Sequence, residues 1–281
     1  MKNIYSAISE VSSFEKEENH LKKIKLYIKK KLVGEIFLPY DSSSILVVLP
    51  QAGYNEKTKK WILRQLMYLL EEEKIGLCIA NYGNHYFKKT DEEFFDYFKK
   101  SISEIRGIIL FIREKLKIEK IDIMGLSFGG ILGFILAAVE EKIKKCIFLI
   151  SGGNFEYITW RSVLRFILKK DCSRITCKNM HKIYKKFLQK KMYDEIFNLP
   201  RKCFLYDPVT FLEYLKEKDI LMINGLFDMV IPFFSVLEIK RKVKNIKILW
   251  YPGTHLTFRY FFPFFKNSVL RFLKNGNKCR C

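Results

Sequence analysis

The sequence predicts an α/β fold, with a mostly parallel central sheet and helices on both of its faces. Short apolar runs alternate with longer amphipathic stretches through most of the chain. Several of the apolar runs end in short loops that contain Gly, Asn or Pro. Strand–helix alternation at this spacing is typical of parallel sheets. We found no internal repeat and no Pro- or Gly-rich linker, so nothing marks a boundary between independent domains.

The hydrophobic pattern places the individual elements. Residues 21–29 alternate apolar side chains with mostly lysine, which predicts a strand, and residues 32–38 form a second one. Residues 44–49 are almost continuously apolar, as expected for a strand buried on both faces. Further strands are predicted at 75–80, 121–124, 146–150, 220–223 and 246–250, with helices near 61–70, 90–116, 129–139 and 234–241.

The helix predicted at 90–116 has clear end signals. Thr90 and Glu93 form a capping box at its start, where acidic residues fill the first turn. Arg113, Lys115 and Lys117 surround its last turn, which suits the helix dipole. By contrast, residues 154–216 contain no clear strand, only helix-like pieces around 157–169, 179–193 and 209–215. We interpret this stretch as an insertion over one edge of the sheet.

Composition limits the class of protein. The chain has 281 residues, of which 49% are hydrophobic and 15% aromatic, and this excludes global disorder. Seven cysteines are too few, and odd in number, for a disulfide framework. The close pairs Cys172/Cys177 and Cys279/Cys281 lack the partners of a zinc site. We therefore expect reduced thiols in a cytoplasmic protein.

The chain is strongly basic. Its 51 Lys and Arg residues outnumber 30 Asp and Glu residues, giving a formal charge of +21. Such a charge is typical of proteins that bind nucleic acid or an anionic membrane surface. The alternative is a compositional bias towards lysine, which we favour because the lysines are spread along the whole chain. The Lys29–Lys31 run fits a turn between strands, and the lysines at 185–191 fit the solvated face of a helix.

No targeting or membrane segment is expected. Residues 1–20 become polar at once and do not fit a secretory signal. The longest apolar run, residues 131–139, is far shorter than the roughly 18 residues that span a bilayer. The aromatic stretch at 258–266 is compatible with a membrane surface, but such a stretch is more often the last helix covering a sheet. We expect no stable membrane contact and no specific nucleic-acid partner.

A G-x-S-x-G motif follows the strand predicted at 121–124. It reads Gly125-Leu126-Ser127-Phe128-Gly129 and opens a helix directly, which is the context of a nucleophile elbow. So tight a turn needs small residues two positions before and after the serine. It would present the Ser127 hydroxyl above the sheet and aim the Phe128 N–H at an oxyanion. A dinucleotide fingerprint needs Gly where Ser127 stands, and a P-loop needs a Lys-Ser/Thr pair that is absent.

The partners of a nucleophilic serine come from two other loops. Among the four histidines, His255 alone follows a late strand, at the end of the sheet where Ser127 is expected. Asp228 follows the preceding strand and could hold the imidazole in one tautomer. The order Ser, Asp, His is the one found in α/β-hydrolases. Glu156 follows an earlier strand and is a weaker candidate for the acid.

With these residues, the chain resembles α/β-hydrolases of the serine-esterase type, from about residue 21 to 273. The resemblance implies Ser127 as nucleophile, His255 as general base and Asp228 as acid. Residues 50–53 stand where the family carries its His-Gly oxyanion loop, but Gln51 and Ala52 replace the usual residues. Backbone N–H groups do that work, so either Gln51 or Ala52 could donate.

The sequences of residues 151–154 and of the Asp207-Pro208 pair are similar to segments of hydrolases related to prolyl oligopeptidase and dienelactone hydrolase. No propeller precedes the domain, dienelactone hydrolases use Cys at the elbow, and dehalogenases need Asp there. We therefore expect hydrolysis of a small carboxylic ester, or of a related thioester or amide, through an acyl-enzyme on Ser127. This reaction requires no metal and no cofactor. The alternative hypothesis is a non-catalytic protein of the same fold that binds nucleic acid or anionic membrane through its basic surface.

The expected organisation is a hydrolase core of residues 1–153 and 217–281 with a helical cap at 154–216. The cap leaves one functional strand end and returns just before the strand that leads to Asp228. It should face the Ser127 opening. Trp160, Leu164, Phe166 and Phe187 are expected to line part of the acyl pocket.

Overall fold

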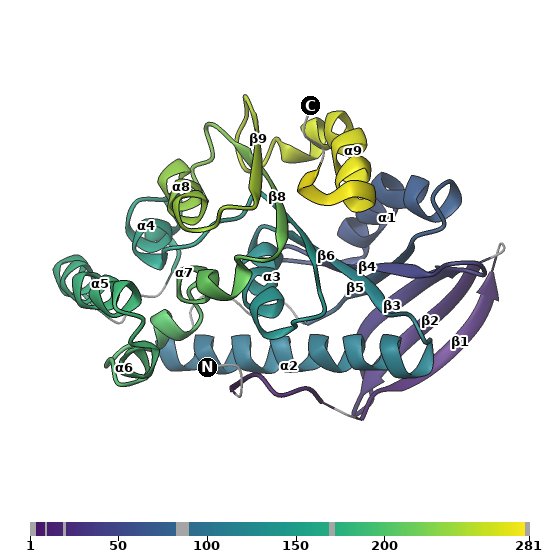
Figure 1. The fold of residues 1–281 in the computed structure, drawn as a ribbon, viewed down its shortest axis with the longest axis horizontal. Helices are drawn as coiled ribbons and strands as arrows, with labels where there is room; N and C mark the ends of the chain where they lie inside the picture. The colour runs from purple at the N-terminus through teal and green to yellow at the C-terminus, as the bar shows by residue number, and fades with distance from the viewer. Residues whose placement is uncertain (1–3, 9, 19–20, 83–89, 169–171, 279–281) are drawn as a thin grey trace.

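The computed structural model describes residues 4–8, 10–18, 21–82, 90–168 and 172–278. The strands are β1 Ser12–Glu18, β2 Leu21–Ile28, β3 Lys31–Pro39, β4 Ser44–Leu49, β5 Gly76–Ala80, β6 Lys120–Leu126, β7 Lys145–Leu149, β8 Asp219–Gly225 and β9 Ile246–Tyr251. They form one sheet in the order β1-β2-β3-β5-β4-β6-β7-β8-β9 (Figure 1). From β5 to β9 all neighbours are parallel, whereas β1, β2 and β3 are antiparallel. The predicted fold class, an α/β fold with a mostly parallel sheet, is confirmed.

The sheet is covered on both faces. The covering helices are α1 Glu56–Glu71, α2 Asp91–Lys115, α3 Phe128–Val139, α8 Phe233–Lys242 and α9 Phe258–Asn275. Alternate residues of β4 show the two layers: Val47 packs in the cluster that contains α2, α3 and α8 side chains. Val48 packs in the opposite cluster, with α1 and α9. All six β4 residues are buried, as the continuous apolar run predicts.

Local signals in the sequence account for several element ends. Lys29 and Lys30 have φ angles of 46° and 67° and form the turn of the β2–β3 hairpin. Two consecutive positive φ angles match the right-handed twist of a hairpin. The Thr90 hydroxyl accepts a hydrogen bond from the Glu93 N–H, and the Glu93 carboxylate accepts one from the Thr90 N–H. The capping box predicted for α2 is therefore present.

The stretch from 154 to 216 contains helices and no strand within its described residues. Its elements are α4 Phe155–Trp160, the 3₁₀ turn η2 Val163–Phe166, α5 Arg174–Gln189, α6 Tyr193–Phe197, η3 Lys202–Leu205, α7 Pro208–Phe211 and η4 Leu212–Leu215. The helix-like piece expected at 157–169 is broken after Trp160, because the Ser162 side chain caps the next turn through the Leu164 N–H. Helices α5 and α6 lie at one end of the molecule, beyond α4 and α7 (Figure 1).

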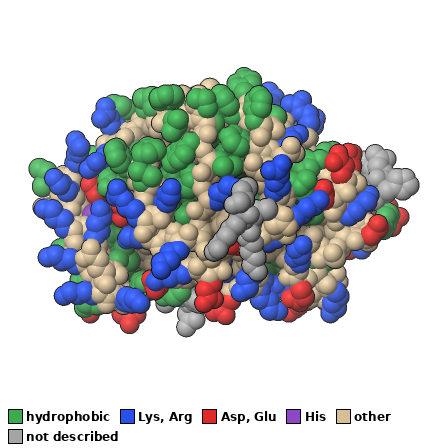
Figure 2. Space-filling view, turned by 45° about the horizontal axis from the view of Figure 1, so that its top comes forward, with side chains coloured by type: hydrophobic (Ala, Val, Ile, Leu, Met, Phe, Trp, Pro, Cys, Tyr) green, Lys and Arg blue, Asp and Glu red, His purple; other side chains and the backbone are tan. Residues whose placement is uncertain are grey.

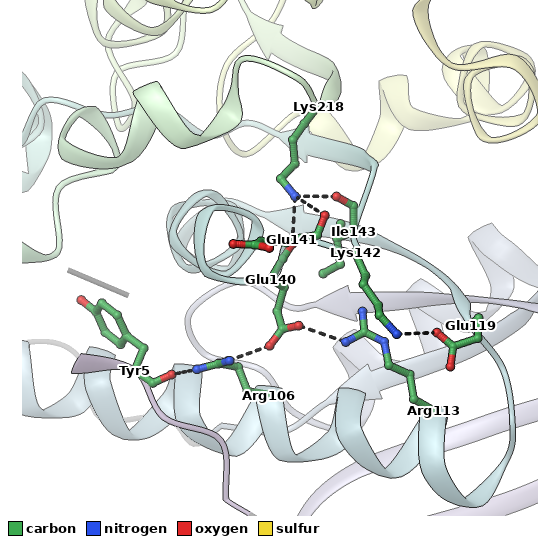
Figure 3. A network of polar contacts seen from close by, with 9 residues as sticks. All are labelled: Tyr5, Arg106, Arg113, Glu119, Glu140, Glu141, Lys142, Ile143 and Lys218. Carbon is green, nitrogen blue, oxygen red and sulfur yellow. Dashed lines mark hydrogen bonds and ion pairs between the residues drawn. The ribbon is translucent and has the colours of Figure 1, made fainter. Parts of the chain in front are cut away.

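A polar network holds the C-terminal end of α3 against its neighbours (Figure 3). The Glu140 carboxylate accepts hydrogen bonds from Arg106 Nε at 2.6 Å and Arg113 Nη1 at 3.1 Å, both on α2. The Lys218 ammonium, just before β8, donates to the carbonyl oxygens of Glu140 and Ile143. Helix α3 is thus fixed at the end opposite Ser127. Within the described residues, none of the helices combines the length and apolar content needed to cross a bilayer.

Candidate active site

Ser127 lies at the sharp turn between β6 and α3. Its φ and ψ angles are 52° and −115°, a conformation that few residues other than glycine adopt. The Ser127 N–H donates a 2.8 Å hydrogen bond to the Leu149 carbonyl of the adjacent strand β7. A Cβ atom on Gly129 would lie 2.1 Å from the Leu49 carbonyl oxygen. The turn therefore needs Gly at this position, as the G-x-S-x-G motif predicts.

The structure brings Ser127, His255 and Asp228 together from three loops. The Ser127 Oγ lies 2.8 Å from His255 Nε2, and His255 Nδ1 lies 2.8 Å from Asp228 Oδ2. Because a carboxylate only accepts, the Nδ1 position carries the hydrogen. This tautomer leaves Nε2 free to accept the serine proton.

Backbone contacts hold the two partner loops in place. The Oδ1 atom of Asp228 accepts hydrogen bonds from the Val230 and Ile231 N–H groups, each at 2.8 Å. The loop after β8 is joined to the loop after β9 by a hydrogen bond from the Phe227 N–H to the Gly253 carbonyl. The Asp228 side chain is fully buried, whereas that of His255 is 13% exposed. Water is thus kept from the carboxylate while the imidazole reaches the cleft.

A cleft of about 590 Å³ opens above these side chains. Its lining includes Ser127 and His255, and its walls are largely apolar, formed by Trp61, Leu126, Ile150, Leu164, Val230, Leu256 and Phe258. The volume lies within the range of sites that take small organic molecules. Two cations, Lys57 and Arg259, also line it. The arrangement can therefore bring an apolar substrate to the serine hydroxyl.

Solved structures of other proteins resemble this architecture. A cold-adapted esterase from an Arctic intertidal metagenomic library aligns with a TM-score of 0.58 at 13% identity, covering 94% of this chain and 98% of that one. Acetyl xylan esterase 1 from Thermoanaerobacterium sp. aligns with a TM-score of 0.61 at 14% identity, covering 95% and 88%. Acylaminoacyl peptidase from Pyrococcus horikoshii aligns with a TM-score of 0.60 at 14% identity, covering 97% of this chain and 42% of that one.

The chain has the α/β-hydrolase fold. This fold assignment rests on the similarity to these structures, on the strand order and on the turn at Ser127. No protein-family model matches the sequence, and no curated protein does. At these identities the likeness concerns the fold, and the chemistry depends on this chain's own residues.

In this α/β-hydrolase fold, the predicted oxyanion residues lie around Ser127. Gln51 and Ala52 line the cleft together with Ser127. Phe128 is the first residue of α3, and its ring packs against Phe98, with centroids 5.2 Å apart. The Oε1 atom of Gln51 is buried and has no hydrogen-bond partner among the described residues. A buried polar group of Gln51 therefore lies at the cleft that Ser127 lines.

The other candidates considered in the sequence lie elsewhere. Glu156 pairs with Arg161 at 3.9 Å, and it is Asp228 that contacts His255. His181 is buried in the insertion, where its Nδ1 atom lies 3.1 Å from the Cys177 carbonyl oxygen. His20 and His85 lie outside the described residues. The described residues contain no group of three or more His, Cys, Asp or Glu side chains that could hold a metal ion.

The expected lining of the acyl pocket is partly wrong. Leu164 lines the Ser127 cleft as expected. Trp160 instead lines a separate small cavity with His181, and Phe166 lines the groove beside Asp228. Phe187 packs inside the insertion, against the cluster of Tyr184, Ile196, Phe204 and Leu205. Helix α4 ends at Trp160 and a new 3₁₀ turn begins after Ser162, so Trp160 and Phe166 do not lie on one continuous helix.

Proposed function

We propose that the protein is a serine hydrolase that cleaves carboxylic esters through an acyl-enzyme on Ser127. The observation that carries the proposal is the pair of 2.8 Å contacts joining Ser127 Oγ to His255 and His255 to Asp228. These contacts support the roles of nucleophile for Ser127, base for His255 and orienting carboxylate for Asp228. A fold alone would not require this arrangement.

In the proposed reaction, Ser127 Oγ attacks the ester carbonyl carbon and its proton passes to His255 Nε2. The imidazolium that forms is stabilised by the Asp228 carboxylate. The Phe128 N–H and an N–H from Gln51 or Ala52 hold the oxyanion. His255 then protonates the departing alcohol, which leaves an acyl group on Ser127. Water, deprotonated by the same imidazole, releases the acid and restores the serine.

Two features favour a small ester as substrate. The similar solved structures include two esterases, and the cleft walls are apolar apart from a few polar and charged groups. Thioesters and amides react through the same steps and remain within the proposal. All five described cysteines are free thiols, which favours a cytoplasmic location.

A non-catalytic protein with this fold is the competing function. It would explain the charge of +21 through binding of nucleic acid or anionic lipid. However, it gives no reason for a strained serine hydrogen-bonded to a histidine. We therefore propose no specific nucleic-acid partner.

Hydrolysis of p-nitrophenyl esters from acetate to decanoate tests the proposal. The wild-type protein should release p-nitrophenolate, and Ser127→Ala should lower kcat by about 10⁴-fold or more. Ser13→Ala, which changes an exposed serine of β1, is the matched control and should keep the wild-type rate. Equal rates for Ser127→Ala and the wild type would contradict the proposal.

A further inference from the structure

Large apolar side chains are exposed at the Ser127 cleft and at a second groove lined by Asp228. The exposed fraction of these side chains runs from 45% for Leu226 to 81% for Leu256. We call them the apolar rim, which consists of Phe166, Leu226, Phe227, Met229, Phe234 and Leu256. In the view of Figure 2, hydrophobic side chains gather on the upper half of the molecule, with Lys and Arg side chains around them.

The apolar rim is built from the segments that carry the candidate active site. Phe227 and Met229 flank Asp228 in the chain, and Leu256 follows His255 and lines the Ser127 cleft. The other members line a groove of about 700 Å³ that also contains Asp228. The rim therefore lies on and next to the loops that carry Asp228 and His255, and Leu256 extends it to the Ser127 cleft.

Backbone hydrogen bonds keep the rim in its exposed position. The Val163 N–H donates to the Met229 carbonyl at 3.0 Å, which joins the insertion to the loop after β8. The Leu226 N–H donates to the Tyr251 carbonyl at 3.0 Å, which joins that loop to β9. These bonds tie the loop after β8 to the segments on either side of it. Contiguous exposed apolar patches of this kind mark contact surfaces for partners or membranes.

Cations border the apolar rim. Arg161 and Arg165 line the groove, while Lys57 and Arg259 line the Ser127 cleft. Among the described residues that line these two openings, the only carboxylate is Asp228, which His255 engages. Apolar side chains surrounded by arginine and lysine match the acyl region and the anionic headgroups of a lipid surface. With a net charge of +21, a second copy of the chain would be repelled at this face.

We propose that the apolar rim docks the protein onto an anionic phospholipid bilayer and that the Ser127 cleft takes its ester from the lipids there. The apolar side chains enter the boundary between headgroups and acyl chains, and the four cations contact lipid phosphates. The docking part of the proposal depends only on the surface residues of the rim. The part that assigns a lipid ester as substrate also rests on the proposed hydrolase function.

Vesicle sedimentation with full-length Ser127→Ala protein tests docking without any turnover. The vesicles contain phosphatidylcholine alone or with about one third phosphatidylglycerol. We expect binding to the anionic vesicles and at least about tenfold weaker binding to the neutral ones. Equal binding to both, or binding to neither, would overturn the proposal.

Two double variants in the same background separate the two kinds of contact. Phe166→Ser/Phe234→Ser and Arg161→Gln/Arg165→Gln should each lower vesicle binding by about tenfold or more. Their controls lie away from the rim: Phe14→Ser on β1, where Phe14 is 63% exposed, and Lys99→Gln/Lys100→Gln on α2, which removes the same charge. Controls that weaken binding as much as the rim variants would show that general basicity, and not the rim, attracts the vesicles.

Two further readouts keep the result interpretable. Thermal unfolding checks that each variant is folded, and light scattering gives the mass of the protein without vesicles. A dimer that Phe166→Ser/Phe234→Ser converts to a monomer would assign the rim to a second copy of the chain and overturn the proposal. Docking by Ser127→Ala, combined with no wild-type hydrolysis of any ester, would retain the membrane surface and reject the lipid-ester substrate.

Discussion

His255 Nε2 lies 2.8 Å from Ser127 Oγ, although the two residues are 128 positions apart in the sequence. The contact follows from the topology, because β6 and β9 run parallel in one sheet and their carboxyl ends lie at the same edge. Strand β8 ends at the same edge of the sheet. The loop that follows it places Asp228 next to His255 Nδ1, on the side of the imidazole away from Ser127. The three residues of the site thus come from three loops that are far apart in the sequence.

Asp228→Asn should leave a folded protein with very little activity. An amide in place of the carboxylate can donate to His255 Nδ1, which favours the tautomer that cannot accept the Ser127 proton. We expect kcat for p-nitrophenyl acetate to fall by about 10⁴-fold with an unchanged melting temperature. Asp194→Asn, at an exposed position of α6, is the control and should keep full activity. A rate within about tenfold of wild type would remove Asp228 from the mechanism.

Gly129→Ala should disrupt the turn at Ser127. The added Cβ would lie 2.1 Å from the Leu49 carbonyl oxygen, so backbone must move. We expect the free energy of unfolding in urea to fall by about 3 kcal/mol or more. Gly34→Ala is the control, because its Cβ would meet the flexible end of Ile108 at 3.1 Å. Equal losses for both variants would contradict the special role of the turn.

Glu140→Gln should destabilise the protein more than Glu119→Gln. The Glu140 side chain is 10% exposed and pairs with Arg106 and Arg113, so its loss leaves two poorly solvated cations (Figure 3). We expect a loss of about 3 kcal/mol in urea unfolding. Glu119 pairs with Lys142 at 3.1 Å, but its side chain is 65% exposed, and its replacement should cost less than about 1 kcal/mol. The opposite ranking would argue against a structural role for the network.

Asp122→Asn should stabilise the protein relative to wild type as the pH rises. Burial raises the pKa of Asp122 to about 6, although the Lys145 and Lys120 charges lower it. The folded protein therefore binds this proton more tightly than the unfolded chain, and wild-type stability falls as the pH rises from about 4 to 6. The difference in unfolding free energy, variant minus wild type, should increase by about 2 kcal/mol between pH 4 and 7. A constant difference across this range would contradict the expected titration.

The strands and the turn at Ser127 could be predicted because their signals are local, whereas Asp228 and His255 were predicted from their positions after later strands. The β4 run is apolar at each of positions 45–49, and the elbow glycines flank Ser127 directly. Strand β1 was missed because its sequence, Ser-Ser-Phe-Glu-Lys-Glu-Glu, has one large apolar side chain. It is held at the sheet edge by antiparallel pairing with β2, which depends on backbone groups. Hydrophobic periodicity carries no signal for such a strand.

The exposed apolar side chains near the cleft could not be predicted from the sequence. The aromatic segment 258–266 is compatible with a membrane surface in the sequence. In the structure Phe258 and Phe262 are buried against the sheet, as expected of a covering helix, whereas Tyr260 and Phe264 are 62% and 80% exposed. Four of the six side chains of the apolar rim come instead from the loops after β8 and β9, namely Leu226, Phe227, Met229 and Leu256. Whether a loop side chain points outward depends on long-range backbone bonds, such as that between Val163 and Met229.

Labelling with a fluorophosphonate tests the central claim, an activated serine at position 127, most directly. Such reagents react with a serine whose proton a neighbouring base removes. Intact-mass and peptide analysis of the purified protein should show one adduct, on Ser127. Ser127→Ala and His255→Ala should both abolish it, and Ser13→Ala should not. Folded wild-type protein that takes up no adduct, or takes it up on another serine, would contradict the account.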